Sequence, residues 1–117
     1  MNKSVVGREG EEKAAAVLKK SGMSIIARNV RSKAGEIDLV ALDGDDLVFV
    51  EVKNWAAYGF EELRRGLDKK KQRRIIETAK FFLAVHREYN GMAVRFDVVF
   101  IGPETVTHLV SAFMEQE

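Results

Sequence analysis

The 117-residue sequence contains no cysteine, and proline and tryptophan each occur only once. Without cysteine the chain can form neither a disulfide framework nor a thiolate metal site, which excludes zinc fingers and fits a reducing compartment. No apolar run approaches the roughly 18 residues of a membrane span, and the first residues lack the apolar segment of a signal peptide. These absences predict a soluble, cytoplasmic protein that has no membrane partner.

The sequence also lacks an excess of either charge, because 19 Lys and Arg residues are balanced by 18 Asp and Glu residues. The net charge of +1 therefore does not by itself indicate a nucleic-acid-binding protein. Positive charge is nevertheless concentrated in the run KKKQRR at positions 69–74, which provides a local basic patch. A solvated helix face is the alternative explanation of this run.

The length and the hydrophobic pattern together predict one small domain over residues 1–117. The expected elements are a helix over 7–21, strands over 23–30, 36–42 and 47–53, a helix over 61–89 with a break near 66–68, and strands over 94–101 and 106–110. The order αβββαββ predicts an α/β protein with a central mixed sheet. The long helix between two strands suits a crossover, so helices should flank this sheet.

The turn Asp43-Gly44-Asp45-Asp46 predicts a hairpin between the second and third strands. Both strands carry apolar residues on both faces, as expected for strands in the interior of a sheet. Pairing of Leu42 with Leu47 across this turn would place Asp38 opposite Glu51. A tighter turn would shift the pairing by two residues and place Glu36 there, but it would leave each side chain on the same face.

Charged residues in covered strands need compensation, and the hairpin contains Asp38, Glu51 and Lys53 on one face. Two facing carboxylates repel each other unless a proton or a cation lies between them. Carboxylate oxygens, a backbone carbonyl and water are the ligands that Mg²⁺ prefers. Lys53 could then orient an attacking water or stabilise negative charge on a phosphate. The alternative is that Lys53 forms a salt bridge with one of the acids and no reaction is catalysed.

Two further charged residues fall on apolar helix faces. Glu11 is in line with Ala14 and Leu18, and Lys71 is in line with Ile75, by the three-and-four spacing of a helix. In the functional interpretation Glu11 binds the metal directly or through its outer shell, and Lys71 holds a phosphate of the substrate. The alternatives are a carboxylate favoured by the helix dipole and a lysine whose stem packs while its amine reaches water.

The ordered motifs resemble the YraN-type family of uncharacterised bacterial proteins. They are Gly7-x-x-Gly10-Glu11, Arg28-Asn29, Gly35-Glu36-Ile37-Asp38-Leu39, Phe49-Val50-Glu51-Val52-Lys53, Lys71 and Phe96-Asp97-Val98-Val99. That family is similar in turn to the PD-(D/E)XK nuclease superfamily, particularly the archaeal Holliday-junction resolvases. The resemblance therefore implies a restriction-endonuclease-like three-layer sandwich.

The resemblance also implies roles for single residues. Asp38, Glu51 and Lys53 would be catalytic, and Glu11, Asp38, Glu51 and the Val52 carbonyl would bind Mg²⁺ or Mn²⁺. Independently of the resemblance, the basic run at positions 69–74 predicts that Lys69, Lys71, Arg73 and Arg74 contact nucleic acid. The family tends to continue with Thr-Arg after this lysine, whereas this chain has Asn54-Trp55. Trp55 is expected to pack rather than to stack on a base, and His86 and His108 are not site candidates.

These observations predict a Mg²⁺- or Mn²⁺-dependent endonuclease that acts on DNA, with branched or flapped structures as candidate substrates. One alternative is a catalytically inactive nuclease-fold module that binds nucleic acid or a protein partner. Another is a protein-interaction domain whose buried ionic cluster holds the sheet together. Resolvase-like relatives are dimers, which leaves a homodimer open.

Overall fold

The computed structural model describes the backbone of residues 3–54 and 67–115, and side chains from residue 7 onward within these ranges. The described elements are α1 (Lys3–Lys20), β1 (Ser24–Arg31), β2 (Glu36–Asp43), β3 (Asp46–Asn54), α3 (Lys69–Val85), the 3₁₀ helix η1 (Arg87–Tyr89), β4 (Ala93–Ile101) and β5 (Val106–Phe113). The predicted α/β order αβββαββ is confirmed. Trp55 and the predicted helix start at Glu61 lie outside the described residues.

The five strands form one sheet in the order β1-β2-β3-β4-β5. All neighbouring pairs are antiparallel except β3 and β4, which are parallel and are connected through α3. A parallel pair needs a long crossover, which the helix supplies. The predicted β2–β3 hairpin therefore lies in the interior of a mixed sheet.

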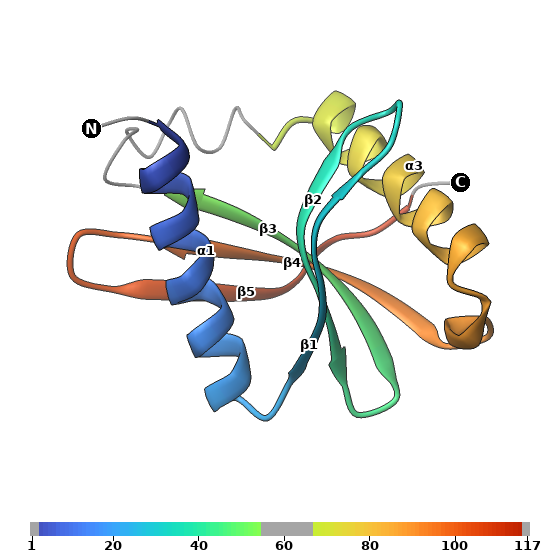
Figure 1. Ribbon diagram of the computed structural model, residues 1–117, viewed down its shortest axis with the longest axis horizontal. Helices are drawn as coiled ribbons and strands as arrows, with labels where there is room; N and C mark the ends of the chain where they lie inside the picture. Colours follow the sequence, from blue (N-terminus) through green and yellow to red (C-terminus); the bar gives the residue numbers. More distant parts are fainter. Residues whose placement is uncertain (1–2, 55–66, 116–117) are drawn as a thin grey trace.

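Alternate residues of β3 pack against different helices, and this divides the core into two layers. Val48 and Val50 pack in the cluster that contains Leu18 of α1, whereas Leu47 and Phe49 pack in the cluster that contains Phe82 of α3. Figure 1 shows α1 in blue and α3 in yellow to orange on either side of the twisted sheet. The arrangement is compatible with the restriction-endonuclease-like sandwich that the motifs implied.

The hairpin turn sets the register that matters most for the site. Leu42 pairs with Leu47, and Asp43 pairs with Asp46, so only Gly44 and Asp45 form the loop. Gly44 has φ +59, as a two-residue turn with glycine at its first central position requires. The predicted pairing of Leu42 with Leu47 is confirmed, and the register shifted by two residues is wrong.

The ends of several elements differ from the prediction. The start of α3 agrees with the predicted break near 66–68, since Asp68 caps the helix by accepting a hydrogen bond from the Lys71 N–H, but α3 ends at Val85 rather than at residue 89. His86 leaves helical geometry with ψ 73, and a short 3₁₀ helix follows. β5 continues to Phe113, because a bulge at Ser111 allows Phe113 to stack on Phe96 at 5.0 Å. Neither described helix has the length and apolar character needed to cross a bilayer.

Candidate active site

Two carboxylates face each other at the end of the hairpin that lies away from its turn. The last paired residues there are Leu39 and Val50, so the next position places Asp38 of β2 opposite Glu51 of β3. Glu51 falls on the α3 face, since it alternates with Val50 and Val52, which pack toward α1. Asp38 borders a cavity on each side of the sheet. Glu51 is only 8 % exposed. Short turn geometry and strand alternation thus bring the two predicted acids together.

The environment of Asp38 disfavours its charged form. Burial raises the pKa of Asp38, and the negative charge of Glu51 raises it further, while a hydrogen bond from the Val52 N–H partly opposes this rise. That N–H lies 2.7 Å from Asp38 Oδ2. Two close carboxylates in such a setting share a proton or hold a cation between them. The pair is therefore ready to bind a positive ion.

Lys53 lies beside this pair, two residues after Glu51 on the same face of β3. Its Nζ is 3.8 Å from Glu51 Oε1, and only 17 % of its side chain is exposed. This separation exceeds the 2.7–3.2 Å range of a good N–H···O hydrogen bond. The ammonium is therefore close enough to interact with the carboxylate, and its three donors are not committed to a tight ion pair with Glu51.

Glu11 approaches Asp38 from the other layer. Burial raises the pKa of Glu11, the charge of Asp38 raises it further, and a hydrogen bond from the Asn29 side chain lowers it. Glu11, Asp38 and Val52 line a cavity of about 110 Å³ between α1 and the sheet. The structure thus brings the predicted helix glutamate to the edge of the carboxylate pair.

The contact between Asn29 and Glu11 was missed by sequence reasoning. Asn29 has φ +53, a left-handed conformation that asparagine adopts more readily than most residues. Its neighbour Arg28 pairs with Glu12, so β1 contacts two successive carboxylates of α1. The motif Arg28-Asn29 was visible in the sequence, but nothing in it indicated which helix residues it would meet.

The donors at this site suit a hard divalent cation. Within residues 3–54 and 67–115, no three His, Asp or Glu side chains converge on one point in the way a preformed metal site requires. The first ligands would be Asp38, Glu51 and the Val52 carbonyl, which points toward β2 as its own N–H does. Mg²⁺ keeps several waters when protein carboxylates bind it, so this incomplete oxygen set is adequate.

The predicted nucleic-acid-binding residues are divided by α3. Lys71 and Arg74 line a cavity of about 250 Å³ that also contains Asp38 and Glu51. In contrast, Lys69 and Arg73 line a separate cavity between α3 and the C-terminal Met114 and Glu115. The sequence run is continuous, but the helix points its members toward two different surfaces.

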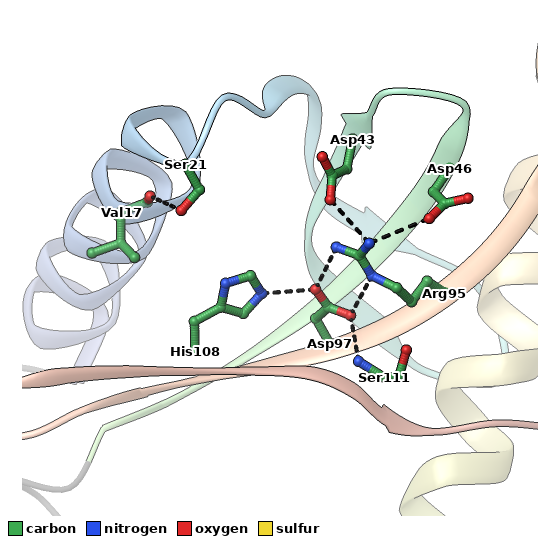
Figure 2. A network of polar contacts seen from close by, with 8 residues as sticks. All are labelled: Val17, Ser21, Asp43, Asp46, Arg95, Asp97, His108 and Ser111. Carbon is green, nitrogen blue, oxygen red and sulfur yellow. Dashed lines mark hydrogen bonds and ion pairs between the residues drawn. The ribbon is translucent and has the colours of Figure 1, made fainter.

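A second polar network was also missed by sequence reasoning, and it is shown in Figure 2. Asp97 is fully buried and accepts hydrogen bonds from Arg95 Nε and Nη2, His108 Nε2 and the Ser111 N–H at 2.7–3.0 Å. Arg95 also reaches Asp43 at 3.0 Å. The network connects β4 to β5 and to the hairpin, so it stabilises the sheet that carries the site. His108 is a strand residue, as expected.

This chain is similar to members of one protein family. The pattern of the uncharacterised protein family UPF0102 matches residues 10–101. A UPF0102 protein of Persephonella marina is 41% identical over 109 residues, covering 93% of each chain. One of Lachnoclostridium phytofermentans is 44% identical over 115 residues, covering 97% of this chain and 96% of the relative. One of Treponema pallidum is 43% identical over 116 residues, covering 93% of this chain and 92% of the relative.

Proposed function

The chain belongs to the uncharacterised protein family UPF0102, and we propose that it is a metal-dependent nuclease that hydrolyses phosphodiester bonds in DNA. One observation carries the proposal: Asp38 and Glu51 face each other in the interior strands, with Lys53 beside them. If these residues only held the sheet together, apolar residues in their place would give a more stable protein, because burying a pair of carboxylates costs free energy. The likeness of the motifs to PD-(D/E)XK nucleases supports the same conclusion.

A bound Mg²⁺ or Mn²⁺ would lower the pKa of a water and polarise the phosphate. Asp38 and Glu51 would hold the ion, together with the Val52 carbonyl, and Glu11 would add negative charge from the α1 side. The Val52 N–H fixes the orientation of Asp38 through its 2.7 Å hydrogen bond. Lys53 would donate to the attacking water or to a phosphate oxygen as negative charge develops there.

The proposed partner is DNA in the cytoplasm, and this choice is supported by Lys71 and Arg74, the basic residues of α3 that share a cavity with Asp38 and Glu51. Backbone contacts through lysine and arginine position a nucleic acid without reading its bases. Cleavage should therefore show no strong sequence preference. Branched and flapped DNA are the first structures to test, because the resolvase-like resemblance favours them.

The test is cleavage of labelled linear, flapped, single-stranded and four-way-junction DNA in Mg²⁺ and in Mn²⁺. The wild type should cut at least one of these substrates, and Asp38→Asn, Glu51→Gln and Lys53→Ala should each lower the rate by about a hundredfold or more. Lys19→Ala is the matched control for the lysine variant, because Lys19 is exposed in the last turn of α1. It should cut at the wild-type rate.

All five proteins should be purified identically, so that a contaminating nuclease is exposed by equal cutting in every sample. Equal activity in the wild type and in Lys53→Ala would contradict the proposal. DNA binding that weakens steeply with salt, without metal-dependent cutting, would instead support a nuclease-fold binding module.

A further inference from the structure

We propose that Lys71 and Arg74, and not Lys69 and Arg73, bind the phosphate next to the bond that is cut. The inference rests on the proposed nuclease function and adds the path of the substrate backbone along α3. It requires a substrate with at least two consecutive phosphates, which excludes a mononucleotide and favours an internal position in a nucleic-acid strand.

The geometry of α3 separates its basic residues into two pairs. Residues three or four apart lie on the same face of a helix, so Lys71, Arg74 and Ile75 share the side that faces the carboxylates. Lys69 and Arg73 are also four apart, and they share the side that faces Met114. A backbone that crosses Asp38 and Glu51 therefore meets only the first pair.

Charges of both signs line the cavity that contains Lys71 and Arg74. Neither Lys71 nor Arg74 forms an ion pair with another described residue, although their cavity also contains Glu36, Asp38 and Glu51. This cavity has a volume of about 250 Å³. Cations and carboxylates thus line one space without neutralising each other. A phosphate between them would be attracted by the basic pair, while the carboxylates hold a metal ion.

One wall of this cavity is held in place by hydrogen bonds and close packing. The hydroxyl groups of Ser32 and Thr78 are hydrogen-bonded at 2.8 Å, and Thr78 also donates to the Arg74 carbonyl at 2.9 Å. Gly35 packs so closely that an added Cβ would lie 3.3 Å from the Cβ of Arg74. In Figure 1 the turn between β1 and β2 lies beside α3. The backbone that carries Arg74 therefore needs no reordering when a phosphate binds, and only the Lys71 and Arg74 side chains are ordered at that point.

The helix N-terminus itself does not supply this site. Asp68 caps α3 by accepting a hydrogen bond from the Lys71 N–H at 2.9 Å, and its negative charge would repel an anion there. The backbone N–H groups of Ala34 and Gly35 are likewise used by Ser32 Oγ. The two basic side chains must therefore provide the binding.

The experiment measures binding of fluorescein-labelled flapped DNA by anisotropy in Ca²⁺, at several salt concentrations and without cleavage. The double variant Lys71→Ala/Arg74→Ala is compared with Lys69→Ala/Arg73→Ala, which removes the same residue types and the same charge from the same helix. The first double variant should bind at least about tenfold more weakly, with a salt slope smaller by about 2. The second should stay within about twofold of the wild type and keep its slope. Restoring charge with Lys71→Arg/Arg74→Lys should recover most of the affinity.

Equal losses in the two alanine variants would overturn the inference, because binding would then be spread over the whole basic run. No loss in either variant, or no binding by the wild type, would overturn it as well. If the wild type bound DNA but cut none, selective loss in Lys71→Ala/Arg74→Ala would still support the contact of this pair with the nucleic-acid backbone. In that case the proposed nuclease activity would fail, and with it the place of this phosphate beside a cut bond.

Discussion

Replacing Asp38 by asparagine should stabilise the metal-free protein, although most substitutions in a sheet destabilise it. The amide oxygen can still accept the hydrogen bond that the Val52 N–H makes to Asp38 at 2.7 Å. The substitution removes the charge that faces Glu51, and facing like charges cost about 0.2–1 kcal/mol even when exposed. With Glu51 almost fully buried, we expect a gain of about 1 kcal/mol, which raises the Tm of a domain this size by roughly 3–6 °C.

The stability that Asp38→Asn gains over the wild type should grow with pH. The folded-state pKa of Asp38 is raised above its ordinary value, so the folded protein binds more protons than the unfolded chain between these two values. The metal-free wild type therefore loses stability as the pH rises through that window. Asp38→Asn lacks this loss. Its advantage in thermal melts with EDTA should be small at about pH 5 and larger at about pH 8.

A bound metal ion should make the wild type more stable than Asp38→Asn. A cation present at about a hundred times its Kd stabilises the folded state by about 2.7 kcal/mol. Mn²⁺ should therefore raise the Tm of the wild type clearly and that of Asp38→Asn much less. Asp43→Asn is the matched control on the same strand, since Asp43 pairs with Arg95 at 3.0 Å and lies away from the site. It should keep the Mn²⁺ response.

The prediction is contradicted if Asp38→Asn melts below the wild type in EDTA and if Mn²⁺ raises the Tm of both proteins equally. That result would make the carboxylate pair a structural element with no metal between its members.

Three further predictions concern the sheet and its turn. Asp97→Ala should cost about 3–5 kcal/mol, measured by urea unfolding, because Arg95 and His108 would lose a buried carboxylate. Burial alone would raise the pKa of Asp97, but hydrogen bonds from Arg95, the Ser111 N–H and His108 hold it below its usual range. Asp97 therefore adds stability above its usual pKa that disappears as the pH falls through the lowered value, and acid titrations of wild type and Asp97→Asn should diverge there. Gly44→Ala should cost about 1 kcal/mol in the same assay, since Gly44 has φ +59 and an added Cβ meets no atom.

The sequence by itself determined the elements and the central pair of acids. Strand alternation has a period of two residues, so the sequence placed Glu36, Asp38 and Glu51 on one face in either register, and the two-residue turn of the structure selected Asp38 as the partner of Glu51. Lys53 follows on the same face for the same reason. These relations are local and depend on the backbone geometry of one hairpin.

Only the tertiary structure decided which distant residues meet around that hairpin. The contact of Asn29 with Glu11, the burial of Asp97 between Arg95 and His108, and the separation of Arg74 from its neighbour in sequence depend on how each helix rotates and packs on the twisted sheet. The spacing of a helix predicts which residues share a face. It does not predict what that face will meet, because the packing angle is set by side chains of both layers together.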